Sequence, residues 1–327
     1  MFPGAPEPLI DLSTGINPVP YPLPPLDPAG FTRLPEPDAE AALRAAAARA
    51  YGAADPALVA AAPGTQILID LLPLLFPARR VAVFGPTYAE HAHAWRKRGA
   101  EAATVTDVTA LDGADVAVVC NPNNPDGRRL PPDLLVGLAD RMAARGGLLL
   151  VDEAFADLEG EKISVAGALP HPALIVLRSF GKTYGLAGLR LGFALAARER
   201  AALIRGALGP WAVSGPAIVI GRQALADREW LAATAARLRR ETRDLDACLA
   251  TAGLRVIGGT LLFRLAEGPA QAAFSRLGRA GIFVRRFPEH PHWLRFGVPG
   301  APDAWDRLRC ALADPAADAL PSPVGAP

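Results

Sequence analysis

A lysine, an aspartate and an asparagine each follow an apolar run of the chain, and together they have the chemistry that binds a pyridine aldehyde. The runs and the residues that follow them are 174–177 with Lys182, 147–151 with Asp152, and 115–120 with Asn124. A neutral lysine amine can form a Schiff base with the aldehyde, and burial or a nearby cation such as Arg190 favours the neutral form. A carboxylate can keep the ring nitrogen protonated, and an amide can bond to the phenolic oxygen of the ring. Because a lone lysine at a strand end is usually solvated, this prediction depends on all three residues together.

The apolar runs predict buried strands, and polar, turn-forming residues follow each of them. In an open α/β sheet the ligand lies beyond the carboxyl ends of the strands. We therefore expect an α/β fold in which the three side chains converge at one edge of the sheet.

Three motifs in this order resemble the fold-type I pyridoxal-phosphate enzymes, the aspartate aminotransferase superfamily. They are Asn-Pro-Asn-Asn-Pro-Asp-Gly at 121–127, Asp-Glu-Ala-Phe at 152–155, and Ser-Phe-Gly-Lys at 179–182 with Arg190 eight residues after the lysine. The resemblance covers nearly the whole chain and is greatest to the branch that holds histidinol-phosphate aminotransferase and the threonine-phosphate decarboxylase of cobalamin biosynthesis. It implies a large domain with a mostly parallel central sheet flanked by helices, a smaller α+β C-terminal domain, and pyridoxal 5'-phosphate as the cofactor.

The resemblance also implies a role for individual residues of these motifs. Lys182 forms the Schiff base with the cofactor, Asp152 bonds to the pyridinium nitrogen, and Asn124 bonds to the phenolic oxygen. Ser179 and Arg190 bind the cofactor phosphate.

A second stretch offers a phosphate site at the start of a helix. Gly64, Thr65 and Gln66 come directly before the apolar run 67–76, which predicts a buried helix. Backbone N–H groups and the positive end of the helix dipole at such a start suit a phosphate dianion. An ordinary N-cap would have a similar sequence, and it is the lysine and aspartate elsewhere in the chain that favour the phosphate site.

Tyr88 follows a predicted strand at 80–84, a place where a tyrosine usually packs half-buried. The resemblance implies that its ring stacks on the pyridine ring of the cofactor. His91 and His93 come next on a predicted helix, and residues two apart face different ways on a helix. We expect both histidines to be surface or packing residues and not a metal pair.

Four residues are candidates for binding the substrate. The guanidinium of Arg295 can hold a carboxylate through two parallel hydrogen bonds, and the resemblance implies that it holds the α-carboxylate. Arg285 and Arg286 are neighbours on the preceding strand and face opposite ways, so one of them is expected to reach a substrate phosphate. Asn17 lies in the segment 11–18, which reads as a turn but is similar to a segment that borders the substrate site in threonine-phosphate decarboxylases.

Two positions depart from the aminotransferase pattern. Phe155 stands where aminotransferases commonly have a tyrosine that bonds to the phenolic oxygen, and phenylalanine has no hydroxyl to donate. Leu34 stands where a tyrosine reaches the cofactor phosphate of the neighbouring subunit. The first departure agrees with the decarboxylase branch. The second removes one usual reason for a shared site, although the family still implies a homodimer.

The composition argues against several other classes of protein. The chain has 327 residues, a net charge of +1 and 51% apolar residues, which gives no electrostatic basis for binding nucleic acid. Cys120, Cys248 and Cys310 are odd in number and widely spaced, so we expect neither disulfides nor a metal site, and a reducing cytoplasm. The N-terminal sequence does not have the pattern of a signal peptide, and the most apolar window is too short to span a membrane.

The length predicts two domains that share a cleft. We expect a proline-rich arm at 1–30, a large cofactor-binding domain at 31–200, and interdomain helices with a small domain at 201–320. The elements expected in the last part are helices at 229–252, 269–280 and 302–312 and strands at 255–265, 282–287 and 293–298. The tail from Asp314 is expected to be frayed.

The sequence thus predicts a pyridoxal-phosphate-dependent enzyme that acts on a small phosphorylated amino acid. By resemblance the reaction is the decarboxylation of L-threonine O-3-phosphate to (R)-1-amino-2-propanol O-2-phosphate, with Lys182 returning a proton. Transamination of histidinol phosphate or a similar amine is the first alternative, because the bond that breaks depends on which one stands perpendicular to the ring. A cofactor-binding regulator without turnover is the second, but such regulators carry a DNA-binding domain for which the arm at 1–30 is too short.

Overall fold

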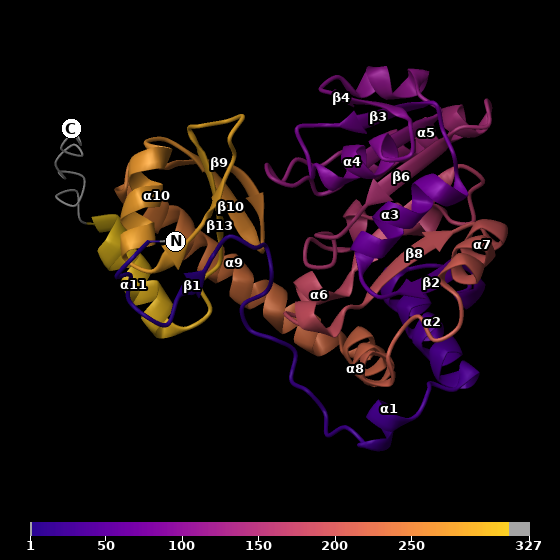
Figure 1. The fold of residues 1–327 in the computed structure, drawn as a ribbon, viewed down its shortest axis with the longest axis horizontal. Coiled ribbons are helices and arrows are strands. Elements are labelled where there is room, and N and C mark those ends of the chain that lie inside the picture. The colour runs from indigo at the N-terminus through magenta and orange to yellow at the C-terminus, as the bar shows by residue number, and fades with distance from the viewer. Residues whose placement is uncertain (1, 314–327) are drawn as a thin grey trace, which may run out of the picture. The chain divides into compact units, whose positions relative to one another are not determined.

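A computed structural model describes residues 2–313 of the chain, and it divides them into two compact units (Figure 1). The larger unit is Val19–Ala235, and the smaller unit combines 2–18 with 236–313. The predicted boundaries after residues 30 and 200 differ from this division, because 19–30 and 201–235 belong to the larger unit. The expected tail from Asp314 lies outside the described residues.

The larger unit is built on a seven-stranded sheet in the order β2-β8-β7-β6-β5-β3-β4. Its strands are β2 (Val59–Ala62), β3 (Arg80–Phe84), β4 (Glu101–Val105), β5 (Val116–Cys120), β6 (Leu148–Asp152), β7 (Leu174–Ser179) and β8 (Gly192–Ala196). The five strands from β7 to β4 run parallel, and β8 runs antiparallel to both of its neighbours. The mostly parallel sheet that the sequence predicts is confirmed.

Helices cover both faces of this sheet, which explains why its central strands are almost wholly apolar. One core contains residues of α2 (Pro37–Tyr51), α5 (Pro132–Ala143) and α8 (Gly215–Ala226), and the other contains residues of α3 (Thr65–Leu75), α4 (Glu90–Arg96) and α7 (Arg198–Leu208). Successive residues of one strand enter opposite cores, as Val118 and Val119 of β5 do. A strand buried on both faces cannot alternate apolar and polar residues.

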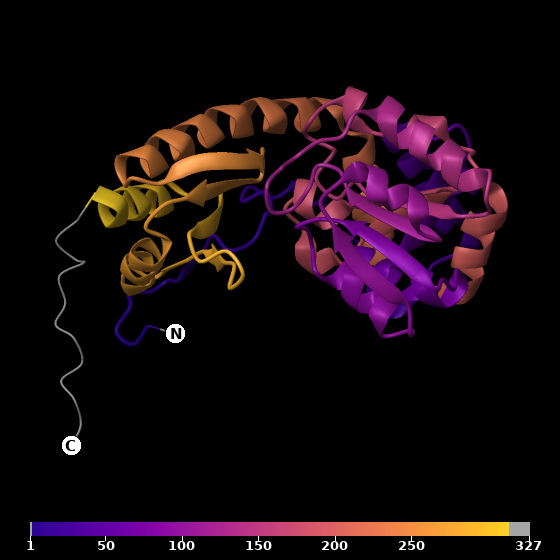
Figure 2. The ribbon, with the colours of Figure 1, turned by 90° about the horizontal axis from the view of Figure 1, so that it is seen from above.

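The remaining helices of the larger unit are short. They are the α-helices α1 (Ala29–Thr32) and α6 (Phe180–Thr183) and the 3-10 helices η1 (Pro56–Leu58), η2 (Val108–Gly113), η3 (Glu161–Ile163), η4 (Ala166–Ala168) and η5 (Ala187–Leu189). The helix α9 (Arg228–Thr251) begins in this unit and continues into the smaller one (Figure 2).

The smaller unit has an antiparallel sheet in the order β12-β13-β10-β9. These strands are β9 (Arg255–Thr260), β10 (Phe263–Glu267), β12 (Arg285–Arg286) and β13 (Trp293–Gly297). Apolar residues of α9, α10 (Ala270–Arg279) and α11 (Pro302–Ala313) share one core with the sheet residues Ala266, Leu294 and Phe296. The three helices therefore pack on the face of the sheet to which these residues point.

The N-terminal segment lies along the smaller unit: β1 (Ile10–Asp11) pairs in parallel with β11 (Ile282–Phe283), and Figure 1 shows the indigo segment beside the orange and yellow elements. The structure corrects two other expectations. The expected strand 282–287 is divided between β11 and β12, and the expected strand 255–265 folds back on itself as β9 and β10. At the bend Gly259 has φ 148°, and a Cβ there would lie 2.3 Å from the carbonyl oxygen of Phe263. Only glycine permits so close an approach, and the leucines at 261–262 hid this turn from the sequence pattern.

Within 2–313, no helix has the length and apolar character needed to cross a membrane.

Candidate functional site

Four neighbouring parallel strands of the larger unit end at the same edge of the sheet. Their order is β7, β6, β5 and β3, and the loops that follow them carry Lys182, Asp152, Asn124 and Tyr88 respectively. The predicted convergence of the lysine, aspartate and asparagine motifs at this edge is confirmed.

Lys182 lies in the single turn of α6 directly after β7 and is half-buried. Its Nζ atom is 3.4 Å from the hydroxyl of Ser179 and 5.1 Å from the centre of the Phe155 ring. The turn is tight, because a Cβ at Gly181 would lie 2.7 Å from the Cα of Ala187. The lysine is thus held between a hydroxyl and an aromatic face, with its amine able to reach a ligand.

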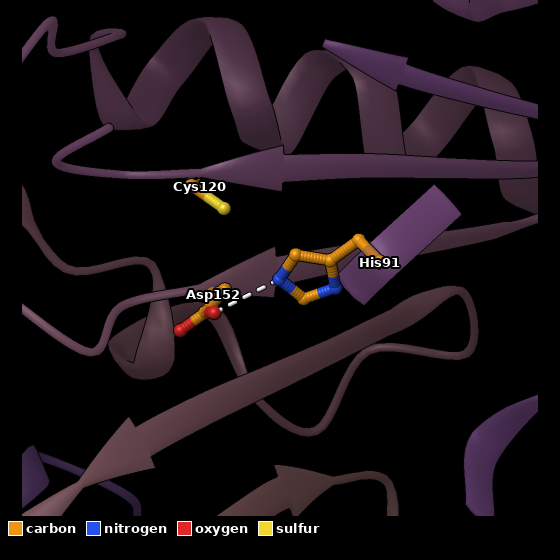
Figure 3. Close-up of side chains that lie close together, drawn as sticks. All are labelled: His91, Cys120 and Asp152. Carbon is orange, nitrogen blue, oxygen red and sulfur yellow. Dashed lines mark hydrogen bonds and ion pairs between the residues drawn. The ribbon is translucent and has the colours of Figure 1, made fainter. Parts of the chain in front are cut away.

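Asp152 ends β6 and is bound on both carboxylate oxygens (Figure 3). Oδ2 lies 2.9 Å from Nε2 of His91, and Oδ1 accepts a hydrogen bond from the backbone N–H of Ala154 at 3.0 Å. Cys120, at the end of β5, is the register partner of Asp152 and lies beside the same pair. All three side chains of this cluster are buried.

His91 and Asp152 each shift the pKa of the other toward the charged form. Burial alone would lower the pKa of His91, but Cys120 and the hydrogen-bonded carboxylate of Asp152 raise it to about 10. Burial alone would raise the pKa of Asp152, but His91, the charge of Lys182 and the N–H of Ala154 hold it below its usual value. Asp152 is therefore ionised at neutral pH, as a partner for a protonated ring nitrogen must be.

His91 has a role beyond the surface or packing role expected from sequence. Its imidazole is fully buried and bonded to Asp152. The bond joins α4 to the end of β6, and the two residues are 61 positions apart in the chain, so local sequence does not reveal it. One sequence signal does point to His91. It lies three residues after Tyr88, and both residues follow β3, one of the strands that end at the site.

Tyr88 and Gln66 meet at the same edge. The Tyr88 hydroxyl donates to Oε1 of Gln66 at 3.1 Å, and its ring contacts that of His91 edge-on with centroids 6.1 Å apart. Nε2 of Gln66 in turn donates to Asp70 one helical turn later. Tyr88 is 40% exposed, although its hydroxyl is bound to Gln66.

The start of α3 and the residue Arg190 form a cradle. Gly64 is the N-cap of α3 with φ 88°, and a Cβ there would lie 2.7 Å from an Nη atom of Arg190. A Cβ at Gly192 would lie 2.7 Å from the backbone nitrogen of Thr65. These two glycines let a guanidinium and the first N–H groups of the helix come together, which suits a dianion.

The loop that carries Asn124 is fixed by its neighbours. The buried side chain of Asn123 donates to the carbonyl of Pro86 and to Asp126, and it accepts from Thr87 at 2.6 Å. Asp126 also accepts from the N–H of Arg128, as a residue of a turn does. Asn124 itself is half-buried in this loop.

A buried ion network joins the ends of β6 and β7. Arg178 donates to Glu153 at 2.5 Å and to Asp157 at 2.5 Å, and its guanidinium lies 4.4 Å from the centre of the Tyr51 ring. Glu153 follows Asp152 directly, and Arg178 is four residues before Lys182. The network therefore fixes both loops that carry the predicted catalytic residues, and no local sequence pattern indicates it.

The substrate candidates all lie in the smaller unit. Arg295 of β13 and Arg285 of β12 are direct cross-strand partners, so their side chains share one face of the sheet. Arg295 is buried, donates to the carbonyl of Ser13 at 2.6 Å and lies 5.2 Å from the centre of the Phe263 ring. Burial and the charge of Arg285 lower the pKa of Arg295 to about 10, although Asp11 opposes this.

Arg286 and Asn17 have other partners. Arg286 points to the opposite face of the sheet, where its guanidinium lies 4.1 Å from the centre of the Phe274 ring on α10. Asn17 is buried, and its side-chain oxygen accepts from Arg237 at 2.7 Å. Of the neighbouring arginines, only Arg285 therefore lies beside Arg295.

The residues of the larger unit fit pyridoxal 5'-phosphate, the cofactor that the sequence resemblance implies. The cradle at Gly64 and Arg190 suits a phosphate, the ionised Asp152 suits a protonated ring nitrogen, and the partly exposed Tyr88 supplies an aromatic ring. Lys182 supplies the amine for the aldehyde.

Comparisons with known proteins agree with this geometry. The family model of aminotransferase class I and II matches residues 14–308. The chain is 48% identical to a threonine-phosphate decarboxylase from Sinorhizobium sp., over 94% of this chain and 92% of that protein. It is 43% identical to a threonine-phosphate decarboxylase from Pseudomonas aeruginosa, over 93% and 91%. Among solved structures, histidinol-phosphate aminotransferase from Sinorhizobium meliloti in complex with pyridoxal 5'-phosphate has a TM-score of 0.80 at 23% identity and covers 93% of this chain and 90% of that one.

Proposed function

Because the chain belongs to the aminotransferase class I and II family, we propose that it is a decarboxylase of L-threonine O-3-phosphate. The products are (R)-1-amino-2-propanol O-2-phosphate and carbon dioxide, which places the reaction in cobalamin biosynthesis. The observation that carries the proposal is the identity of 48% and 43% to two threonine-phosphate decarboxylases along nearly the whole chain. The enzyme depends on pyridoxal 5'-phosphate, which when bound withdraws electrons from the bonds of the substrate's Cα.

We propose the following roles for the residues of the larger unit. Lys182 holds the cofactor through its Nζ atom, and after carbon dioxide leaves it returns a proton to the Cα. Asp152 accepts a hydrogen bond from the ring nitrogen and is kept ionised by His91. Asn124 bonds to the phenolic oxygen and Tyr88 stacks on the ring.

The cofactor phosphate is assigned to residues at the start of α3, at the end of β7 and directly after η5. They are Gly64, Thr65, Gln66, Ser179 and Arg190. Backbone N–H groups, a hydroxyl and a guanidinium together supply the donors that a dianion requires. The contact between Arg190 and Gly64 supports this assignment.

We assign the substrate's two anionic groups to neighbouring arginines. Arg295 holds the α-carboxylate, and Arg285, its cross-strand partner, holds the phosphate. Arg286 is a less suitable phosphate ligand because it stacks on Phe274. Asn17 stays a candidate for substrate contact through the segment 11–18, which also supplies the Ser13 carbonyl to Arg295. Two guanidinium groups side by side complement a phosphorylated amino acid.

The phenylalanine at 155 favours decarboxylation over transamination. Its ring lies against the amine of Lys182 and offers no hydroxyl to the phenolic oxygen, in agreement with the decarboxylase branch. Histidinol-phosphate transamination is the alternative, since both reactions need the same lysine and aspartate.

One experiment separates these functions: purified enzyme is given threonine phosphate without any keto acid. We expect carbon dioxide to form over many turnovers while the cofactor stays in its aldehyde form. Conversion of the cofactor to its amine form after one turnover would show a transaminase instead. Cofactor binding without either product would show a regulator. Lys182→Ala should lower turnover by at least about 1000-fold, and full activity of this variant would overturn the assignment.

We further propose that the enzyme is a cytoplasmic homodimer. Its three cysteines are free, which is consistent with a reducing compartment. Phe31, Leu34 and Trp211 of the larger unit are large apolar residues that are 68%, 62% and 54% exposed, and a second subunit would cover such residues. Light scattering during gel filtration measures the mass, and a monomer at every concentration tested would contradict the dimer.

A further inference from the structure

The cluster of His91, Cys120 and Asp152 offers a set of ligands for a metal ion (Figure 3). It contains an imidazole nitrogen, a thiol sulfur and a carboxylate oxygen, and these three atoms lie within 4.8 Å of one another. Imidazole and thiolate together select thiophilic divalent ions such as Zn²⁺ over Mg²⁺ or Ca²⁺. A zinc site with three protein ligands keeps its fourth position for water.

The fold brings the three ligands together from separate elements. Cys120 and Asp152 are register partners at the ends of the adjacent strands β5 and β6, and His91 reaches them from α4. Nε2 of His91 and Oδ2 of Asp152 are 2.9 Å apart, and an ion shared between them in tetrahedral geometry would hold them at roughly 3.3 Å. The backbone N–H of Ala154 holds the second carboxylate oxygen and would orient this ligand as the outer partners of metal sites do.

The Nε2 atom of His91 is the one that faces the other two ligands (Figure 3). The Nδ1 atom is buried and has no hydrogen-bond partner among the described residues. Binding would replace protons by the ion, because metal-bound cysteine is a thiolate and metal-bound histidine gives up the proton on the ligating nitrogen.

We propose that the cofactor-free protein binds one Zn²⁺ ion through His91, Cys120 and Asp152, and that this ion and pyridoxal 5'-phosphate exclude each other. The exclusion rests on the proposed function, in which the ring nitrogen needs the same carboxylate of Asp152. The ion takes up that carboxylate, so a chain that carries it cannot place the cofactor ring. Zinc thereby blocks cofactor loading, and bound cofactor protects the cluster from zinc.

Cobalt(II) is the probe, because its thiolate bond gives a charge-transfer absorption that zinc lacks. The full chain is prepared with and without cofactor, and each form is titrated with CoCl₂ and then with ZnCl₂. We expect the cofactor-free chain to bind one cobalt ion with a thiolate band that zinc removes, and the cofactor-loaded chain to show no band. Adding pyridoxal phosphate to the zinc form should yield the visible absorption of the lysine-bound cofactor only slowly or after a chelator is added.

Cysteine variants test the ligands. Cys120→Ser should lose the thiolate band and weaken metal binding by at least about tenfold, while it still binds the cofactor. The matched control, Cys248→Ser with Cys310→Ser, should keep both properties, because these cysteines lie outside the cluster. A band that disappears in the control variant, or that persists in Cys120→Ser or in the cofactor-loaded chain, would overturn the proposal.

The metal site and the proposed reaction are tested by separate measurements, so either can fail without the other. Carbon dioxide release by the cofactor-loaded enzyme tests the function, whereas the cobalt band of the cofactor-free chain tests the metal site. His91→Gln provides a second ligand variant, and its metal binding should weaken like that of Cys120→Ser. Wild-type affinity in His91→Gln would exclude the cluster as the site.

Discussion

Two buried arginines, one in each unit, have their pKa values shifted in opposite directions. Arg178 and Arg295 are both less than a tenth exposed, and burial alone would lower the pKa of either. Arg178 is bonded to Glu153 and Asp157, and these carboxylates raise its pKa above the usual value. Arg295 faces Arg285, and its pKa is lowered to about 10.

The difference shows how one residue type can serve stability or binding. The charge of Arg178 is balanced by carboxylates of the protein, so the folded state is already complete around it. The charges of Arg295 and Arg285 repel each other, and an anion between them would relieve that repulsion. Charge pairing within the chain therefore indicates a structural arginine, and like charges on one face indicate an anion site.

The same substitution at both arginines tests the contrast, with the largest effect expected at Arg178. Arg178→Met leaves two buried carboxylates without their partner and should lower the free energy of unfolding by about 3–5 kcal/mol. Urea denaturation measures this. Arg198→Met is the control, because its ion pair with Asp55 is largely exposed and should contribute less than about 1 kcal/mol. Equal losses in the two variants would contradict a special role for the buried network.

Arg295→Met should act on binding and leave the folded state nearly as stable. We expect kcat/KM for threonine phosphate to fall by about 10- to 100-fold, the value of a charged hydrogen bond to a substrate anion. Arg295→Lys should recover only part of this, since an ammonium cannot make two parallel bonds to a carboxylate. A loss of stability as large as that of Arg178→Met would remove the distinction between the two arginines.

Arg285 and Arg286 allow the two faces of one strand, β12, to be compared. Arg285→Ala should raise KM for threonine phosphate by about tenfold, because it removes the arginine that shares a face with Arg295. Arg286→Ala should leave KM nearly unchanged and cost less than about 1 kcal/mol of stability through its contact with Phe274. Steady-state kinetics give KM for both variants. A larger increase of KM in Arg286→Ala than in Arg285→Ala would assign the phosphate to Arg286.

A change of stability with pH is expected from His91, whose charge resembles that of Arg178 in being balanced by a carboxylate of the protein. Its folded pKa of about 10 exceeds its usual value of 6.5. The folded chain therefore holds a proton that the unfolded chain releases, so this contribution to stability is complete below pH 6.5 and is lost as the pH rises toward 10. Between pH 6.5 and 10 the free energy of unfolding of the cofactor-free protein should fall by up to about 1.4 kcal/mol per pH unit.

His91→Gln checks this prediction, since glutamine can bond to Asp152 but does not titrate. The difference in stability between wild type and variant should shrink as the pH rises from 6.5 to 10. Urea denaturation at a series of pH values gives the difference, and a constant gap across this range would show that His91 does not carry the extra proton.

Much of the larger unit follows from sequence because its signals are local. The strand 80–84 was predicted at the bounds that β3 has, and the apolar runs before Asp152 and Lys182 are β6 and β7. Sequential parallel strands place their following loops at one edge, so the motifs converge wherever the flanking helices lie. The smaller unit was harder to predict, since the pairing of β1 with β11 joins residues about 270 positions apart.

The sequence by itself determined the chemistry: which residues can bind a phosphorylated pyridine aldehyde, and in which kind of sheet. Only the tertiary structure decided which neighbours tune that chemistry. Nothing near His91 in the chain indicates its bond to Asp152, and nothing in the pair Arg285-Arg286 indicates which one faces Arg295. The physical reason is that residue type sets what a group can do, whereas its pKa and its accessibility depend on charges and surfaces contributed by distant parts of the chain.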